Sequence, residues 1–283
     1  MKYIDMRMRP PTPQFRQQHH DLESYVNSRY AYGMKSHPVW LNQSLEQCVK
    51  DMEKYNYVGV AIARSIPATT VPNDHVRELA DKYPNRFIPV GGVDGSPKNL
   101  RPALAELDRI AKVLKLRGVA MDTGFLDPPM LADDPRLYPI YERCSELGLF
   151  VGLQIGPLCG PTLAFSKAEQ VEKVLRDFPK LQLLLMHGAF PFIDEVFCLM
   201  LRYSNLWWSP DSWGIRYKTD DIRWIMTGAA CQDRCLFGSA LPYGAGIIET
   251  IQWYDKNWSS VPEEVKEKYF YKNALRLFGL KEV

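Results

Sequence analysis

Two short stretches decide the fold class: LFVGLQI at Leu149–Ile155 and LQLLLM at Leu181–Met186. Both are nearly continuous apolar runs, without the alternation of apolar and polar residues that marks a half-buried strand. A strand carries such a run when both of its faces are buried, as in a parallel sheet covered by helices. The two stretches therefore predict a parallel sheet with helices packed against it.

The same kind of run recurs along the 283 residues, with a helical pattern between successive runs. Six more strands are predicted at Lys2–Met8, Tyr57–Ala63, Arg86–Val93, Leu116–Met121, Leu206–Ser209 and Arg234–Ser239. Eight such units predict an α/β protein that folds as a single (β/α)₈ TIM barrel over residues 1–283, closed by a C-terminal helix at 262–278. A doubly wound sheet is the alternative, but no glycine-rich phosphate-binding turn follows the first strand.

One connection is much longer than the others. Residues 9–43 separate the first strand from its helix and carry Tyr25, Tyr30, Tyr32 and Trp40. A loop of this length inside a compact domain is usually functional. We expect it to form a lid over the mouth of the barrel, with His19 and His20 exposed to solvent.

Composition excludes several classes of function. With 35 basic and 33 acidic residues the net charge is +2, which argues against nucleic acid as a partner. No apolar run reaches the length of a membrane span, and the N-terminus lacks the apolar core of a signal peptide. The six cysteines are scattered and complete no zinc motif, so we expect reduced thiols in a cytoplasmic protein.

In a TIM barrel the functional side chains follow the carboxyl ends of the strands. The first strand ends in Asp5-Met6-Arg7-Met8-Arg9. Strand alternation predicts that Asp5, Arg7 and Arg9 point into the barrel, with Met6 and Met8 toward the helices. The ends of later strands carry Asp94, Asp122, Gln154, His187, Asp211 and Ser239-Ala240.

Several motifs resemble the amidohydrolase superfamily, specifically the amidohydrolase-related group that holds the aminocarboxymuconate-semialdehyde decarboxylase-like enzymes. The matching segments, in order, are Ile4-Asp5, FIPVGGVD at 87–94, MHGAFP at 186–191, FGS at 237–239 with Pro242-Tyr243, and KNALRLFGL at 272–280. The resemblance runs through nearly the whole chain and implies a TIM-barrel enzyme.

The departures from the family pattern concern its metal ligands. The resemblance implies His-x-His at Arg7-Met8-Arg9, a histidine at Gln154 and an aspartate at Ala240, so only His187 is kept. Guanidinium groups repel a divalent cation and offer it no lone pair. We therefore expect no catalytic metal and no other cofactor, and we expect the arginines to hold a carboxylate or polarise a carbonyl.

The catalytic candidates are His187 as general base, with Asp122 or Asp211 as its acid–base partner. The predicted substrate-binding residues are Arg7, Arg9, Gln154, Trp208, Ser239 and Tyr243. Other interpretations stay open: Arg7 pairs with Asp5, His187 is a core histidine, or the aspartates cap the following segments.

Three functions compete at this point. The first is a metal-independent hydrolase of a small carboxylate-bearing metabolite, such as a lactone or an aromatic ester. The second is a decarboxylase or other carbon–carbon lyase, in which the arginines bind the carboxylate and His187 handles the proton. The third is an inactive barrel that binds an anionic metabolite or a protein partner. A homodimer or homotetramer is expected in each case.

Overall fold

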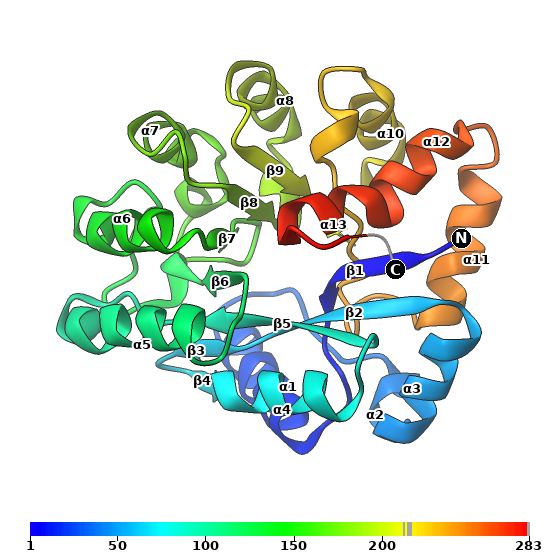
Figure 1. The fold of residues 1–283 in the computed structure, drawn as a ribbon, viewed down its shortest axis with the longest axis horizontal. Helices are drawn as coiled ribbons and strands as arrows, with labels where there is room; N and C mark the ends of the chain where they lie inside the picture. Colours follow the sequence, from blue (N-terminus) through cyan, green and yellow to red (C-terminus); the bar gives the residue numbers. More distant parts are fainter. Residues whose placement is uncertain (212, 214–216, 282–283) are drawn as a thin grey trace.

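The computed structural model describes residues 1–211, 213 and 217–281. Seven strands form one parallel sheet that curls around a central axis, with the helices outside it (Figure 1). In spatial order they are β1 (Tyr3–Met8), β2 (Tyr57–Ile62), β5 (Phe87–Gly92), β6 (Gly118–Met121), β7 (Phe150–Gln154), β8 (Leu183–Met186) and β9 (Leu206–Ser209). The predicted parallel sheet with surrounding helices is confirmed. An antiparallel hairpin, β3 (Arg64–Ile66) and β4 (Thr69–Val71), follows β2.

Helices occupy the segments between the strands, as the helical patterns predict, and two more lie in the connection 9–43, where a loop is expected. They are α1 (Pro13–Asn27), α2 (Pro38–Asn42), α3 (Leu45–Lys54), α4 (Asn73–Lys82), α5 (Leu100–Lys112), α6 (Tyr138–Leu147), α7 (Glu169–Asp177), α8 (Ile193–Arg202), α10 (Thr219–Thr227), α11 (Ile247–Asn257), α12 (Glu263–Glu267) and α13 (Asn273–Phe278). A π-helical turn at Lys268–Lys272 joins α12 to α13 in place of one continuous closing helix. Within the described residues, no helix is both long and apolar enough to span a bilayer.

The predicted eighth strand, Arg234–Ser239, is not a strand in the structure. Its residues lie between β9 and β1, where Leu236 N–H donates to Trp208 O and Phe237 O accepts from Met6 N–H. Phe237 N–H donates to Tyr269 O, and Ser239 N–H binds the Asp5 carboxylate at 2.8 Å, so neither donor binds a strand partner. The Asp5 carboxylate thus takes the place of a backbone partner at the point where an eighth strand would close the sheet.

The alternation predicted for β1 is wrong at Asp5 and Met6. Ile4 and Met6 pack in the apolar cluster that takes side chains from each strand of the seven-stranded sheet and from α13, which crosses one end of the barrel in Figure 1. Asp5 instead accepts a hydrogen bond from Tyr57 Oη, whose ring belongs to the layer between sheet and helices. The register of β1 against β2 shifts between Asp5 and Met8, and this irregularity brings Arg7 to the site described below.

The connection 9–43 is not an irregular loop, because it carries α1 and α2. Thr12 caps α1 by accepting from Phe15 N–H, and Pro13 takes the first helical position, where a missing N–H costs nothing. Trp40 of α2 is buried, and its indole N–H donates to Arg9 O at 2.8 Å. The segment is therefore tied to the carboxyl end of β1.

Candidate active site

A pocket with an empty volume of about 750 Å³ lies at the carboxyl ends of the strands, where barrel enzymes hold their sites. The 9–43 connection supplies Leu22, Val26, Tyr32 and Met34 to its wall. The remaining lining residues are Arg9, Arg64, Phe125, Gln154, Leu158, Cys159, His187, Trp213, Tyr217, Ala240 and Tyr243. We call this the outer pocket.

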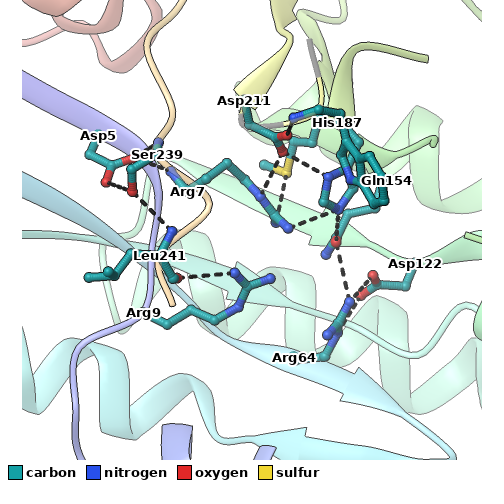
Figure 2. A network of polar contacts seen from close by, with 12 residues as sticks. Asp5, Arg7, Arg9, Arg64, Asp122, Gln154, His187, Asp211, Ser239 and Leu241 are labelled. Carbon is teal, nitrogen blue, oxygen red and sulfur yellow. Dashed lines mark hydrogen bonds and ion pairs between the residues drawn. The ribbon is translucent and has the colours of Figure 1, made fainter. Parts of the chain in front are cut away.

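His187 lines the outer pocket, and Asp211 and Arg7, which are not among its lining residues, contact the His187 ring and each other (Figure 2). His187 Nδ1 lies 2.8 Å from Asp211 Oδ2, and His187 Nε2 lies 2.9 Å from Arg7 Nη2. Arg7 Nε lies 3.5 Å from the same Asp211 oxygen. Because a guanidinium can only donate, Nε2 is the acceptor, and the ring proton belongs on Nδ1, facing the carboxylate.

The environment keeps this histidine neutral. Burial lowers the pKa of His187 below its ordinary value; Asp211 opposes the shift and Arg7 reinforces it. Burial alone would raise the pKa of Asp211, but His187 and Arg7 outweigh it and the net shift is downward. At neutral pH the pair is an unprotonated imidazole beside a carboxylate, which is the ionisation state of a general base with its orienting partner.

The backbone at these two residues is also unusual. His187 has φ 62° and Asp211 has φ 43°, in the left-handed region that residues with a Cβ rarely adopt. Such strain concentrates at functional sites, where the surrounding contacts hold it. The two strained residues are the ones whose side chains meet here.

Arg64 and Asp122 form a second buried pair. Arg64 Nε donates to Asp122 Oδ2 at 2.9 Å, and its Nη2 contacts the other carboxylate oxygen. The same Nη2 donates to Gln154 Oε1 at 3.2 Å, and this oxygen lies 3.3 Å from His187 Nε2. Gln154 thus links the two clusters. Asp122 is bound to Arg64, and within the part of the chain that the structure describes its carboxylate forms no hydrogen bond or ion pair with His187, so the predicted pairing with that base is not formed.

Arg64 is the functional candidate that the sequence analysis missed. It directly follows the predicted strand Tyr57–Ala63 and begins the short β3. No side chain had been assigned to the end of this strand, although the rule that found His187 and Gln154 applies equally there.

Arg9 differs from the other two arginines of the site. It is 8% exposed, its Nη1 donates to Leu241 O at 3.3 Å, and its guanidinium lies 5.5 Å from the ring centre of Tyr243. Among the residues that the structure describes, no carboxylate forms an ion pair with Arg9. Burial, with Arg7 nearby, lowers the pKa of Arg9 to about 9, so it remains a cation at neutral pH. A buried cation without a counterion is costly, which favours an anionic ligand here.

Two predicted substrate-binding residues do not line the outer pocket. Trp208 is fully buried within β9, and its indole N–H donates to Gly188 O at 3.1 Å. The Ser239 hydroxyl donates to Asp5 and accepts from Leu241 N–H. Both side chains support the backbone next to the site. The remaining predictions, Arg7, Arg9, Gln154, His187, Asp211 and Tyr243, come together at the pocket or its floor.

The expectation that His19 is exposed is wrong. His19 is 2% exposed and lies between Trp40 and Tyr243, with ring centres 4.8 and 4.6 Å away. Neither ring nitrogen has a hydrogen-bond partner among residues 1–211, 213 and 217–281. Burial lowers the pKa of His19 well below its ordinary value of 6.5, and the positive charges of Arg9, Arg64 and Arg7 add to the shift.

This shift makes His19 a source of acid instability. As the pH falls through about 6.5, His19 takes up a proton in the unfolded chain but stays neutral in the folded chain. The free energy of unfolding therefore decreases. We expect the melting temperature of the wild type to fall between pH 7.5 and pH 5, and that of His19→Leu to fall less. His20→Leu, on the exposed side of the same helix, is the matched control. Parallel pH profiles for wild type and His19→Leu would contradict the prediction.

The divalent metal that the resemblance implies does not fit these residues. At the positions in question stand Arg7, Arg9, Gln154 and Ala240, and the Nε2 atom of His187 faces the Arg7 guanidinium. Arginine provides donors only. The described residues contain no cluster of three histidine, cysteine or acidic side chains that could hold a metal ion.

Comparisons with known proteins agree with this architecture. An uncharacterized TIM-barrel protein of Bordetella bronchiseptica is 29% identical, covers 99% of each chain and superposes with a TM-score of 0.85. A probable 2-pyrone-4,6-dicarboxylic acid hydrolase of Acinetobacter baumannii shares the fold, with 14% identity, coverage of 99% of this chain and 100% of that one, and a TM-score of 0.67.

In sequence, the chain is 27% identical over 139 residues to the 2-amino-3-carboxymuconate-6-semialdehyde decarboxylase of Dictyostelium discoideum. That match covers 42% of this chain and 38% of the relative's length. The family model described as Amidohydrolase matches residues 4–280. The resemblance stated from the sequence motifs is confirmed, and the chain belongs to the amidohydrolase family.

Proposed function

We propose that this protein is a metal-independent hydrolase that cleaves a lactone or ester of a small carboxylate-bearing metabolite. One observation carries the proposal: His187, with its pKa lowered, lies between Asp211 and the outer pocket. An unprotonated imidazole oriented by a carboxylate is the arrangement that takes a proton from an attacking nucleophile.

In the proposed reaction His187 Nε2 removes a proton from water as the water oxygen bonds to the substrate carbonyl carbon. The guanidinium of Arg7, released from Nε2, donates to the developing oxyanion. Once protonated, Nε2–H has an acceptor at Gln154 Oε1, 3.3 Å away. The acyl C–O bond then breaks, and the imidazolium returns its proton to the leaving oxygen.

The substrate class follows from Arg9 and the aromatic wall. Arg9 supplies the positive charge for a carboxylate, in a charge-assisted contact. Tyr32 and Trp213, with ring centres 5.2 Å apart, line the pocket together with Phe125, Tyr217 and Tyr243. Flat rings favour a planar or aromatic ligand body.

Decarboxylation is the second candidate, because the Dictyostelium relative is named as a decarboxylase. Replacing a carboxylate by hydrogen requires a group that delivers a proton to carbon. Because the pKa of His187 is lowered, its imidazole is mostly unprotonated at neutral pH. It is therefore better suited to accept a proton as a base than to deliver one as an acid. Hydrolysis is therefore the leading proposal.

The two reactions leave different products, which makes the test direct. The protein is incubated in H₂¹⁸O with pyrone carboxylates and hydroxybenzoates, and the products are measured by mass spectrometry. Incorporation of one ¹⁸O into a product acid, abolished in His187→Asn, supports hydrolysis. Release of carbon dioxide, with no ¹⁸O in the remaining organic product, supports the decarboxylase. Binding of these acids without turnover would make the barrel an inactive receptor and contradict the proposal.

Metal independence is a separate prediction. We expect purified protein to contain substoichiometric zinc and manganese, because two guanidiniums occupy the positions that the family pattern gives to ligands. Elemental analysis measures this, and dialysis against a chelator is expected to leave turnover unchanged. One tightly bound metal ion per chain would contradict it.

A further inference from the structure

A second, smaller cavity adjoins the outer pocket. It is lined by Arg7, Met8, Arg9, Gln18, Ile62, Ala63, Arg64 and Gln154, and its empty volume is about 270 Å³. The space inside it admits about one water molecule or one oxygen atom. We call it the inner cavity. It shares Arg9, Arg64 and Gln154 with the outer pocket, so one ligand can reach into both.

The inner cavity carries excess positive charge. The guanidinium groups of Arg7, Arg9 and Arg64 point toward the same region (Figure 2). Asp211 forms an ion pair with Arg7, and Asp122 forms one with Arg64. The positive charge of Arg9 has no counterion among the described residues. Asp5 does not compensate it, because its carboxylate binds the backbone N–H of Arg7 and the hydroxyls of Tyr57 and Ser239. A single negative charge in the cavity would balance the cluster.

Gln18 is the residue of this cavity that the reaction proposed above does not use. It comes from α1 and is 3% exposed, and no described residue forms a hydrogen bond with its Oε1. A buried amide without partners is costly and is normally satisfied by a ligand or an ordered water. Rotation of the amide presents its NH₂ group to an anion and its oxygen to a neighbouring arginine.

We propose that the inner cavity binds one oxygen of the substrate carboxylate, held by Arg9, Arg64 and the Gln18 amide. The ring of the substrate then lies in the outer pocket, with its scissile carbonyl beside His187. The inference rests on the proposed function for the claim that the carboxylate belongs to a substrate. Gln18 is thereby assigned as a specificity-determining residue within the 9–43 connection.

The first test measures binding without turnover. Calorimetry compares benzoate with benzamide, which has the same shape but no charge. We expect wild-type protein to bind benzoate at least about tenfold more tightly, since a charge-assisted contact to arginine is lost with benzamide. Equal affinity for the two compounds would overturn the proposal.

The second test supplies the missing charge from the protein itself. In Gln18→Glu a carboxylate of nearly the same size stands in the cavity and pairs with the arginines. We expect this variant to melt at a higher temperature than wild type without ligand, and to bind benzoate at least about tenfold more weakly. Gln252→Glu, the same change on the exposed surface of α11, is the matched control and should alter neither value.

Two additional measurements distinguish the remaining explanations of the binding data. Gln18→Leu removes the amide without adding charge and is expected to weaken benzoate binding while the fold is kept. If chloride alone raises the melting temperature of wild type and benzoate adds nothing, the cavity is a halide site and the proposal is wrong. If Gln18→Glu binds benzoate like wild type, the inference fails even where ¹⁸O incorporation upholds the hydrolase.

Discussion

Replacing His187 by Asn is expected to lower kcat by about 10²–10⁴-fold, the usual contribution of general acid–base catalysis. Asparagine keeps much of the size and hydrogen-bonding capacity of the ring but has no basic nitrogen. Substrate affinity should change little, because the cation assigned to the carboxylate is Arg9. The measurement is steady-state kinetics on a substrate identified by ¹⁸O incorporation.

The pH profile supplies an independent readout of the same role. A base must be unprotonated, so the activity of the wild type should rise with pH until it passes the pKa of His187 and then level off. Because burial lowers that pKa, the plateau should already be reached below the ordinary histidine value of 6.5. The variant should lose this limb of the profile.

His20→Asn makes the same change at an exposed position on α1 and should retain full activity. Normal turnover by His187→Asn would remove His187 from the role of base. A variant that fails to fold would instead support the reading of His187 as a core histidine.

The strands could be predicted because burial on both faces leaves a continuous apolar run, as at Leu149–Ile155 and Leu181–Met186. The prediction of the last strand, Arg234–Ser239, was wrong because of a contact that no local sequence pattern reveals. Ser239 N–H binds Asp5, a residue 234 positions away, in place of a strand neighbour. A composition that suits a strand does not reveal that a distant side chain competes for its backbone.

The helix α1 was missed although its signals are present. Thr12-Pro13 is an N-terminal cap followed by proline, and Phe15, Leu22 and Val26 recur at helical spacing. His19 falls on the same face, which explains its burial. The length of the 9–43 connection favours a loop, whereas the apolar periodicity inside it favours the helix that the structure shows.

Several residues predicted at strand ends contact one another in the structure, because parallel strands bring their carboxyl ends together. The direction of each side chain was less predictable. Trp208 lies within β9 and Ser239 bonds to Asp5, so neither reaches the outer pocket. Asp122 does follow β6, but its carboxylate is bound by Arg64, and this pairing changes what the residue can be expected to do.

Replacing Asp122 by Asn is expected to destabilise the fold by about 3–5 kcal/mol, the usual cost of breaking a buried ion pair from one side. Arg64 would keep its positive charge in a site where its side chain is 5% exposed, with only neutral amide oxygens, those of Gln154 and of the introduced amide, in place of the carboxylate. Since the free energy of unfolding of a domain is only about 5–15 kcal/mol, this decrease should shift the midpoint of urea unfolding to a clearly lower urea concentration.

Two further variants test whether loss of the Arg64–Asp122 ion pair causes the lower stability of Asp122→Asn. Asp81→Asn breaks an exposed pair with Arg77, in which the carboxylate is 66% exposed, and should change stability far less. The double variant Arg64→Met with Asp122→Leu removes both charges and should recover much of the loss, because no unpaired cation remains buried. If Asp122→Asn unfolds at the same urea concentration as wild type, the pair is not structural. Its carboxylate would then again be a candidate for the acid–base role that the sequence first assigned to it.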